Sequence, residues 1–203
     1  MMKRVLLAGL LGGIAMFVWS SFAHIALSLG NTGVKEIPNE QNVLAGMQAQ
    51  LGTTSGLYMF PGMGLGPNPT RQEQNAAMKQ YDQKLATSPS GLLIYHPPGA
   101  KALSPGQLGT EFLTEVAEAL LLALLLAQTT LRTFASRMGF VMLAAVMAAI
   151  TTNIPYWNWY GFPVNYTSAY MFIEFMDYVV AGMVVSAILK PRVIAAKPLA
   201  VAA

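Results

Sequence analysis

Five acidic residues lie in or beside two stretches of this chain that are otherwise apolar. Glu111, Glu115 and Glu118 follow a spacing of four and three residues, and Glu174 and Asp177 lie three residues apart. On a helix, each set therefore shares one face. A carboxylate at the centre of a bilayer costs about 2.5–3.5 kcal/mol on insertion scales, so it generally faces a bundle interior, a partner or water. We interpret these acids as the best indication of a functional site.

The same depth in the membrane is predicted for polar residues of all four apolar stretches. A helical rise of 1.5 Å per residue places them in the outer third of a bilayer. The predicted proton- or cation-binding residues are His24, Glu115, Glu118, Asn153, Glu174 and Asp177.

Two kinds of ligand suit this set of side chains. One histidine with several carboxylates can hold a divalent metal, and His24, Glu118 and Asp177 could bind zinc with a position left open for water. The chain has no H-E-x-x-H motif and no cysteine, so the metal pattern is not specific. Alternatively, crowded carboxylates in a low dielectric cannot all ionise, and some of them then keep a proton.

Three functions follow from these alternatives. The leading hypothesis is a proton- or cation-binding site open to the periplasm. The second is a membrane-embedded enzyme, metal-dependent or not, that acts on a lipid or another apolar small molecule. The third is an accessory subunit of a larger membrane complex, in which the acids form a static hydrogen-bonded network.

Four apolar stretches must position these residues. Hydrophobic residues make up 54% of the 203, and charged residues only 10%, against roughly 25% in soluble domains. The stretches cover about 5–29, 112–131, 138–154 and 168–189, each near the length that crosses a bilayer. Pro155 is predicted to end the third. We therefore predict an all-α membrane protein, a four-transmembrane-helix bundle that forms one integral membrane domain over residues 1–203.

The orientation follows from the basic residues. With four spans, one side of the membrane receives Lys3, Arg4, Arg132, Arg137, Lys190, Arg192 and Lys197. Lysine and arginine favour the cytoplasmic side, which predicts N-in and C-in termini in a bacterial inner (cytoplasmic) membrane. The uncharged stretch 155–167 is rich in aromatic residues, as at a membrane interface. The lipid bilayer is the predicted partner, a homo-oligomer or larger complex stays open, and no basic patch indicates nucleic-acid binding.

The first 23 residues also resemble a signal peptide, with a basic start, an apolar centre and a small-x-small site that ends at Ala23. The apolar run continues to Leu29, which favours an uncleaved span.

Residues 30–110 are predicted to be an extracytoplasmic insertion between spans one and two, mostly helical or irregular. Helices are predicted at 39–51, ended by Gly52, and at 70–85, begun by a capping box of Thr70 and Glu73. The stretch 56–67 is too rich in glycine and proline for a regular element and is predicted to cap the site. Residues 92–95 are predicted to be extended.

Four segments together resemble uncharacterised bacterial four-span inner-membrane proteins of similar length. These segments are Phe17–His24, Tyr58–Gly62, Gly91–Pro97 and Asn153–Pro163. The resemblance implies the four-span architecture and no activity.

Overall fold

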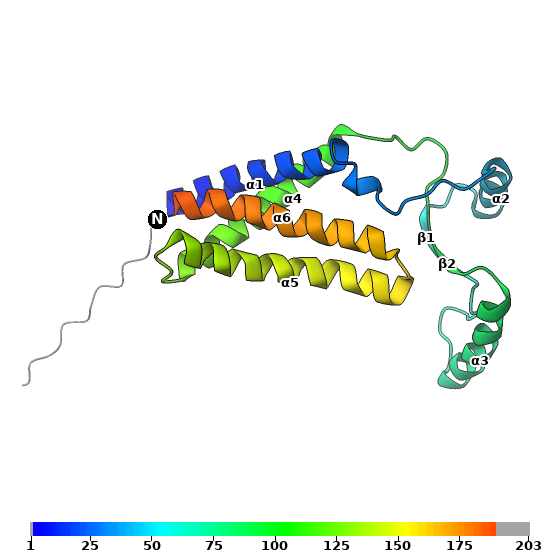
Figure 1. Cartoon of the computed structure of the whole chain (residues 1–203). Helices are drawn as coiled ribbons and strands as arrows, with labels where there is room; N and C mark the ends of the chain where they lie inside the picture. Colours follow the sequence, from blue (N-terminus) through cyan, green and yellow to red (C-terminus); the bar gives the residue numbers. More distant parts are fainter. Residues whose placement is uncertain (1, 190–203) are drawn as a thin grey trace, which may run out of the picture. The chain divides into compact units, whose positions relative to one another are not determined.

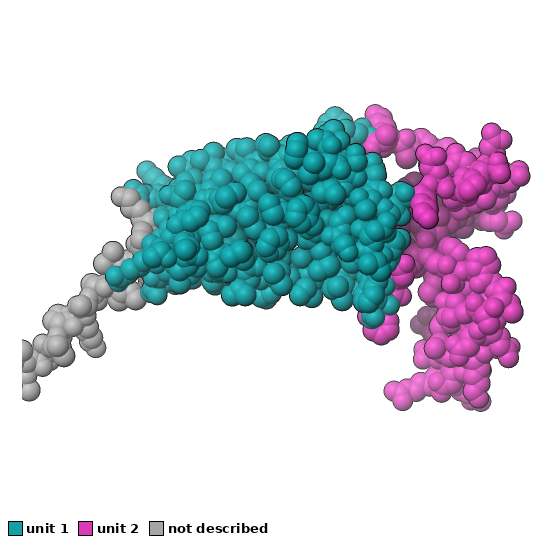
Figure 2. Space-filling model, in the orientation of Figure 1, with its two compact units in different colours: residues 1–34, 103–158, 162–203 teal, residues 35–102, 159–161 magenta. Residues whose placement is uncertain are grey.

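The computed structural model describes residues 2–189, in which helices predominate (Figure 1). Its helices are α1 (Met2–Ile25), η1 (Leu29–Asn31, a 3₁₀ helix), α2 (Gln41–Leu51), α3 (Arg71–Thr87), α4 (Pro105–Gln128), α5 (Phe134–Tyr160) and α6 (Val164–Ile188). Two strands, β1 (Gly56–Phe60) and β2 (Gly91–Tyr95), complete it. The chain forms two compact units (Figure 2). One holds α1, α4, most of α5 and α6, and the other holds α2, α3 and the strands.

Three of the described helices, not four, are long and apolar enough to cross a membrane: α1, α5 and α6. Every 18-residue stretch of α4 contains Glu111, Glu115 and Glu118, whereas each candidate span has such a stretch with at most two charged residues. The prediction of a four-span bundle, N-in and C-in, with an extracytoplasmic segment between spans one and two is therefore wrong. The glutamates that indicated a site also remove α4 from the set of candidate spans.

The orientation argument depended on four spans and loses its basis with them. Three of its basic residues, Lys190, Arg192 and Lys197, lie outside the described part of the chain. A fourth, Arg137, is buried, and its guanidinium donates hydrogen bonds to the carbonyls of Ser186 (2.9 Å) and Leu131 (3.2 Å). Arg137 therefore satisfies free carbonyls, including one in the last turn of α6.

The helical unit presents a largely apolar surface. In each candidate span, no more than 39% of the 18-residue apolar stretch that identifies it is buried. Large hydrophobic side chains are exposed along α1 and α5, among them Leu6, Leu10, Val18, Leu143 and Met147. Soluble proteins rarely expose apolar patches of this extent. Such patches are instead typical of protein surfaces that face the hydrocarbon of a bilayer. Together with the three candidate spans, this surface indicates a membrane protein.

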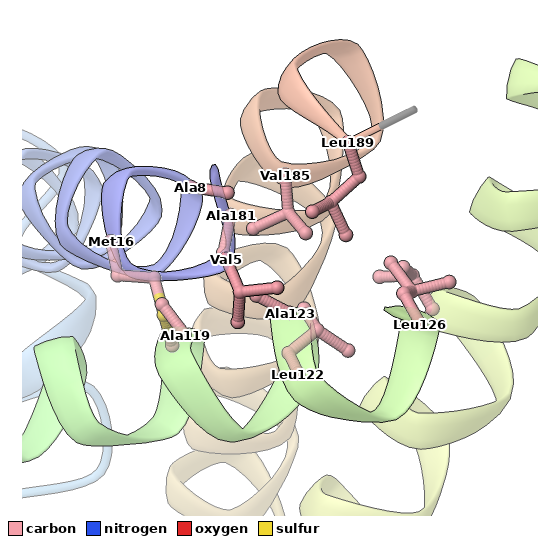
Figure 3. Packing of buried hydrophobic residues seen from close by; sticks show 11 residues of the cluster. Val5, Ala8, Met16, Ala119, Leu122, Ala123, Leu126, Ala181, Val185 and Leu189 are labelled. Atoms are coloured by element: carbon pink, nitrogen blue, oxygen red, sulfur yellow. The ribbon is translucent and has the colours of Figure 1, made fainter. Parts of the chain in front are cut away.

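Glycines let α1 approach its neighbours closely. Helix α1 packs along α4 and α6, around a core of small and branched side chains (Figure 3). A Cβ atom on Gly9 would lie 2.7 Å from the Cα of Leu120, and one on Gly13 would overlap the backbone of Val116. On α6, a Cβ on Gly182 would lie 2.5 Å from Val141 of α5. Small residues at such crossings are typical of helix pairs in membranes.

Helix α5 continues past the residue that was predicted to end it. Pro155 lies inside α5, which runs to Tyr160. A proline removes one hydrogen bond of the helix, and in membrane helices the freed carbonyl is commonly satisfied by local adjustment, so the helix is not forced to stop.

The second unit contains both predicted helices of the 30–110 segment. Helix α2 ends at Gly52, whose φ is 59°. Helix α3 begins with the predicted capping box, in which the amide of Glu73 donates to Thr70 Oγ1 and the amide of Thr70 donates to the Glu73 carboxylate. The prediction that 56–67 has no regular element is wrong, because residues 56–60 form β1. This strand pairs antiparallel with β2, Gly56 opposite Tyr95, and the partner lies too far along the chain for local composition to reveal it.

Replacing Glu73 with alanine is expected to fray the first turn of α3. Hydrogen bonds from the backbone and hydroxyl of Thr70 hold the pKa of the Glu73 carboxyl below its ordinary value. Its contribution is therefore present above the ordinary pKa of a glutamate and is lost as the pH falls through the lowered value. Hydrogen exchange of the first-turn amides, corrected for intrinsic rates, should show this loss in the wild type and faster exchange at neutral pH in Glu73→Ala. The control is Asp82→Ala on the same helix, and equal exchange in both variants would contradict the capping role.

Gly13→Ala is expected to destabilise the helical unit by about 1–3 kcal/mol, the usual cost of overpacking a close contact. The added methyl group would meet the backbone of Val116, which cannot move as a side chain can. Gly139→Ala is the matched control, because nothing lies within 4 Å of a Cβ built there. Thermal unfolding in detergent measures both, and a Gly13→Ala protein as stable as the control would show that α1 and α4 are not in close contact.

Candidate functional site

Polar side chains from four helices point into the helical unit. The buried polar side chains of the described residues include one from each of α1, α4, α5 and α6, all at most 9% exposed: Ser20, Glu115, Asn153 and Asp177. Beside them, Glu118 of α4 and Glu174 and Tyr178 of α6 are half-buried. The periodicity of each helix places these groups on its inner face, as their spacing predicted for α4 and α6.

A side-chain hydrogen bond joins α5 to α6 in this polar region. The Asn153 side-chain amide donates a 2.8 Å hydrogen bond to Glu174 Oε2 and a 3.0 Å bond to the carbonyl of Ala149. At the same region of α6, the indole of Trp19 donates to the carbonyl of Ile173 (3.3 Å), which ties α1 to α6. The Ser20 hydroxyl lies beside the Glu115 carboxyl, and the Tyr178 hydroxyl lies beside the Glu118 carboxyl. Helices α1, α4, α5 and α6 thus all contribute to one polar region.

Two carboxylate oxygens in this region have no partner. Glu115 Oε2 and Asp177 Oδ1 are buried and make no hydrogen bond. The carboxyl of Asp177 is within electrostatic range of Glu115, Glu118 and Glu174. Leaving a buried charge unpaired costs several kcal/mol, and like charges nearby add to that cost. A proton or a cation on these carboxyls would remove it.

His24 has different neighbours. Its Nδ1 lies 2.9 Å from the carbonyl oxygen of Ser20, and its ring meets that of Tyr170 edge-on at 5.8 Å. A Cβ atom on Gly30 would overlap the imidazole, and the Tyr170 hydroxyl donates to the Gly30 carbonyl (3.4 Å). These contacts hold His24 against the turn after α1. Its part in a proton- or cation-binding site stays a prediction.

The predicted metal site finds no support in the geometry. Within residues 2–189, no group of three or more histidine, cysteine, aspartate or glutamate side chains is placed to hold a metal ion. The proposed zinc ligands His24, Glu118 and Asp177 are therefore not assembled as a ligand set. Glu111, the first acid of the row on α4, is exposed.

A groove opens next to the polar region. Its volume is about 700 Å³, and it is lined mostly by apolar residues of α4 and α5. The polar residues of its lining are Glu118, Thr151, Thr152 and Tyr178. Sequence analysis identified neither the groove nor Tyr178. The tyrosine follows Glu174 by four residues, so helical periodicity places both on one face and could have indicated it. The groove depends on how α4 and α5 flank α6, which no local pattern reports.

Comparisons with known proteins found no match: no family model fits the chain, and no curated protein or solved structure is similar to it. The resemblance to bacterial four-span proteins is not tested by these comparisons.

Asn153→Ala is expected to destabilise the protein by about 1–3 kcal/mol, because it leaves the Glu174 carboxylate without its amide donor. Thr151→Ala is the control, since that hydroxyl bonds only to the carbonyl of Met147 on an exposed face. In a double-mutant cycle with Glu174→Gln, measured by thermal unfolding, the two changes should couple by at least about 0.5 kcal/mol. Additive effects would contradict the contact.

Proposed function

We propose that this chain is a multi-pass protein of a bacterial inner membrane whose acidic residues bind a proton or a small cation. The binding groups are the carboxyls of Glu115, Glu118, Glu174 and Asp177. One observation carries the proposal: Glu115 Oε2 and Asp177 Oδ1 are buried without partners, on two different helices, and their carboxyls are within electrostatic range of each other.

The surroundings of the acids favour a charge-neutralising ligand. Asn153 already supplies a hydrogen bond to Glu174, and the hydroxyls of Ser20 and Tyr178 lie beside Glu115 and Glu118. Asp177 is the carboxyl whose neighbours are mainly other acids. Acids that interact this strongly take up protons as a group rather than one by one. A proton or monovalent cation held near Asp177 would serve all of them.

Membrane location is supported by three candidate spans and by the exposed apolar side chains of α1 and α5. The lipid bilayer is then the main partner. A divalent metal is not part of the proposal, because the described side chains offer no suitable ligand group.

The proposal predicts that the stability of the folded protein depends on its ligand. Thermal unfolding of detergent-solubilised wild type is followed between about pH 5 and pH 9 and in sodium, potassium or choline chloride. A proton-binding site is stabilised as the pH falls, by at most about 1.4 kcal/mol per pH unit and proton. A cation-binding site is stabilised by sodium or potassium and not by choline. For a chain of this size, 1 kcal/mol shifts the melting temperature by about 2–4 °C.

The variants Glu115→Gln and Asp177→Asn are expected to lose this dependence, because their neutral amides need neither proton nor cation. Asp82→Asn removes an exposed acid of α3 that is not among the electrostatic neighbours of Glu115, Glu118 or Asp177, and it should respond like the wild type. If both buried variants respond to pH and salt as the wild type does, the proposal is wrong. If the wild type responds to neither and the variants lose only stability, the acids form a static network, as expected for an accessory subunit.

A further inference from the structure

We infer that the groove formed by α4, α5 and α6 binds a lipophilic cation, a molecule with an apolar body and a positively charged head that pairs with Glu118. This inference rests on the proposed function, because it uses the same group of acids as the source of negative charge. It adds the class of molecule that the site takes and the surface through which that molecule enters.

The groove has the size and lining of a binding site for a small organic molecule. Its volume of about 700 Å³ falls within the roughly 300–1,000 Å³ of small-molecule sites. Its walls are formed by apolar side chains of α4 and α5, including Leu121, Leu125, Phe140, Leu143 and Met147. Leu121, Leu143 and Met147 are more than 60% exposed, so the groove is open along its length to the apolar surroundings of the helices.

The charge of the groove selects the head group. Among the described residues that line it, Glu118 is the one acid, and neither lysine nor arginine is present. Glu174 and Asp177 are within electrostatic range of Glu118, and their carboxyls add negative charge in the state in which they carry no proton; Asp177 is buried with one oxygen unpartnered. In a setting of low dielectric this charge attracts cations strongly and repels anionic head groups.

Aromatic rings strengthen the preference. Tyr178 and Phe140 both line the groove, and the faces of aromatic rings attract organic cations. A neutral lipid tail would fill the apolar walls and leave Glu118 without a counter-charge. The apolar body of a lipophilic cation would pack against the walls, and its charge would pair with Glu118.

The direct test is saturable binding of radiolabelled tetraphenylphosphonium to the full chain in a neutral detergent. We expect binding to the wild type and at least ten-fold weaker binding to Glu118→Gln, which corresponds to a loss of about 1.4 kcal/mol. Asp82→Asn, which removes an exposed acid outside this group, should bind like the wild type. A long-chain quaternary ammonium ion should compete for the site, and the alcohol of equal chain length should not.

A second pair of variants tests the groove rather than the charge. Ala144→Trp places a large ring inside the groove and should abolish binding, whereas Leu113→Trp adds the same ring to an exposed position of α4 that does not line it. Gel filtration shows that each variant is folded and monodisperse before binding is measured. Equal binding by the two tryptophan variants would overturn the inference.

The other outcomes are equally decisive. Absence of saturable binding, unchanged affinity in Glu118→Gln, or equal competition by the alcohol would each overturn the inference.

The chain has no cysteine, so Met147→Cys provides a single thiol. Efficient disulfide formation between two such copies would assign the groove to a second copy and overturn the inference as well. If tetraphenylphosphonium fails to bind while stability still depends on pH or small cations, the proposed function stands without this ligand. If tetraphenylphosphonium does not bind and stability depends on neither pH nor small cations, both the proposed function and this inference are wrong.

Discussion

The burial of carboxyl groups among apolar helices is the constraint on which the arrangement of the helical unit depends. The inner face of α4 carries Glu115, which is buried, and Glu118, which is half-buried. Burying such groups is costly unless neighbouring helices supply polar partners. The structure meets this requirement with α1 and α6, which pack against α4. Gly9 and Gly13 allow the approach, because any side chain at these positions would collide with the α4 backbone. Polar and steric demands therefore select the same pairing of helices.

The carboxyls of the site differ in how completely they are hydrogen-bonded. Glu174 has an amide donor from Asn153, whereas Glu115 and Asp177 each keep a buried oxygen without a partner. A purely structural network would be expected to satisfy all its members, since a partly satisfied one costs stability. The unsatisfied oxygens thus resemble a site that is completed by a ligand, which is why we propose proton or cation binding for them rather than a scaffolding role.

The acids also border the apolar groove through Glu118. On the proposed function, a proton on the carboxyls and an organic cation in the groove would neutralise the same negative charge. Each would then weaken the binding of the other, because the coupling between two ligands is reciprocal. Glu118 lines the groove and is within electrostatic range of the buried Asp177, which is the physical basis for such competition.

The sequence by itself determined the features that depend on neighbours a few residues away. These include the helices, the capping box of Thr70 and Glu73, and the common faces of the acids on α4 and on α6. It did not give the number of candidate spans correctly. The span at 112–131 was predicted from the length of its apolar run, although α4 carries three glutamates. Only the tertiary structure decided that His24 turns to Gly30 and Tyr170, that β1 pairs with β2, and that Tyr178 lies beside Glu118. The reason is physical: periodicity fixes which residues share a helix face, and the packing of distant segments fixes what that face meets.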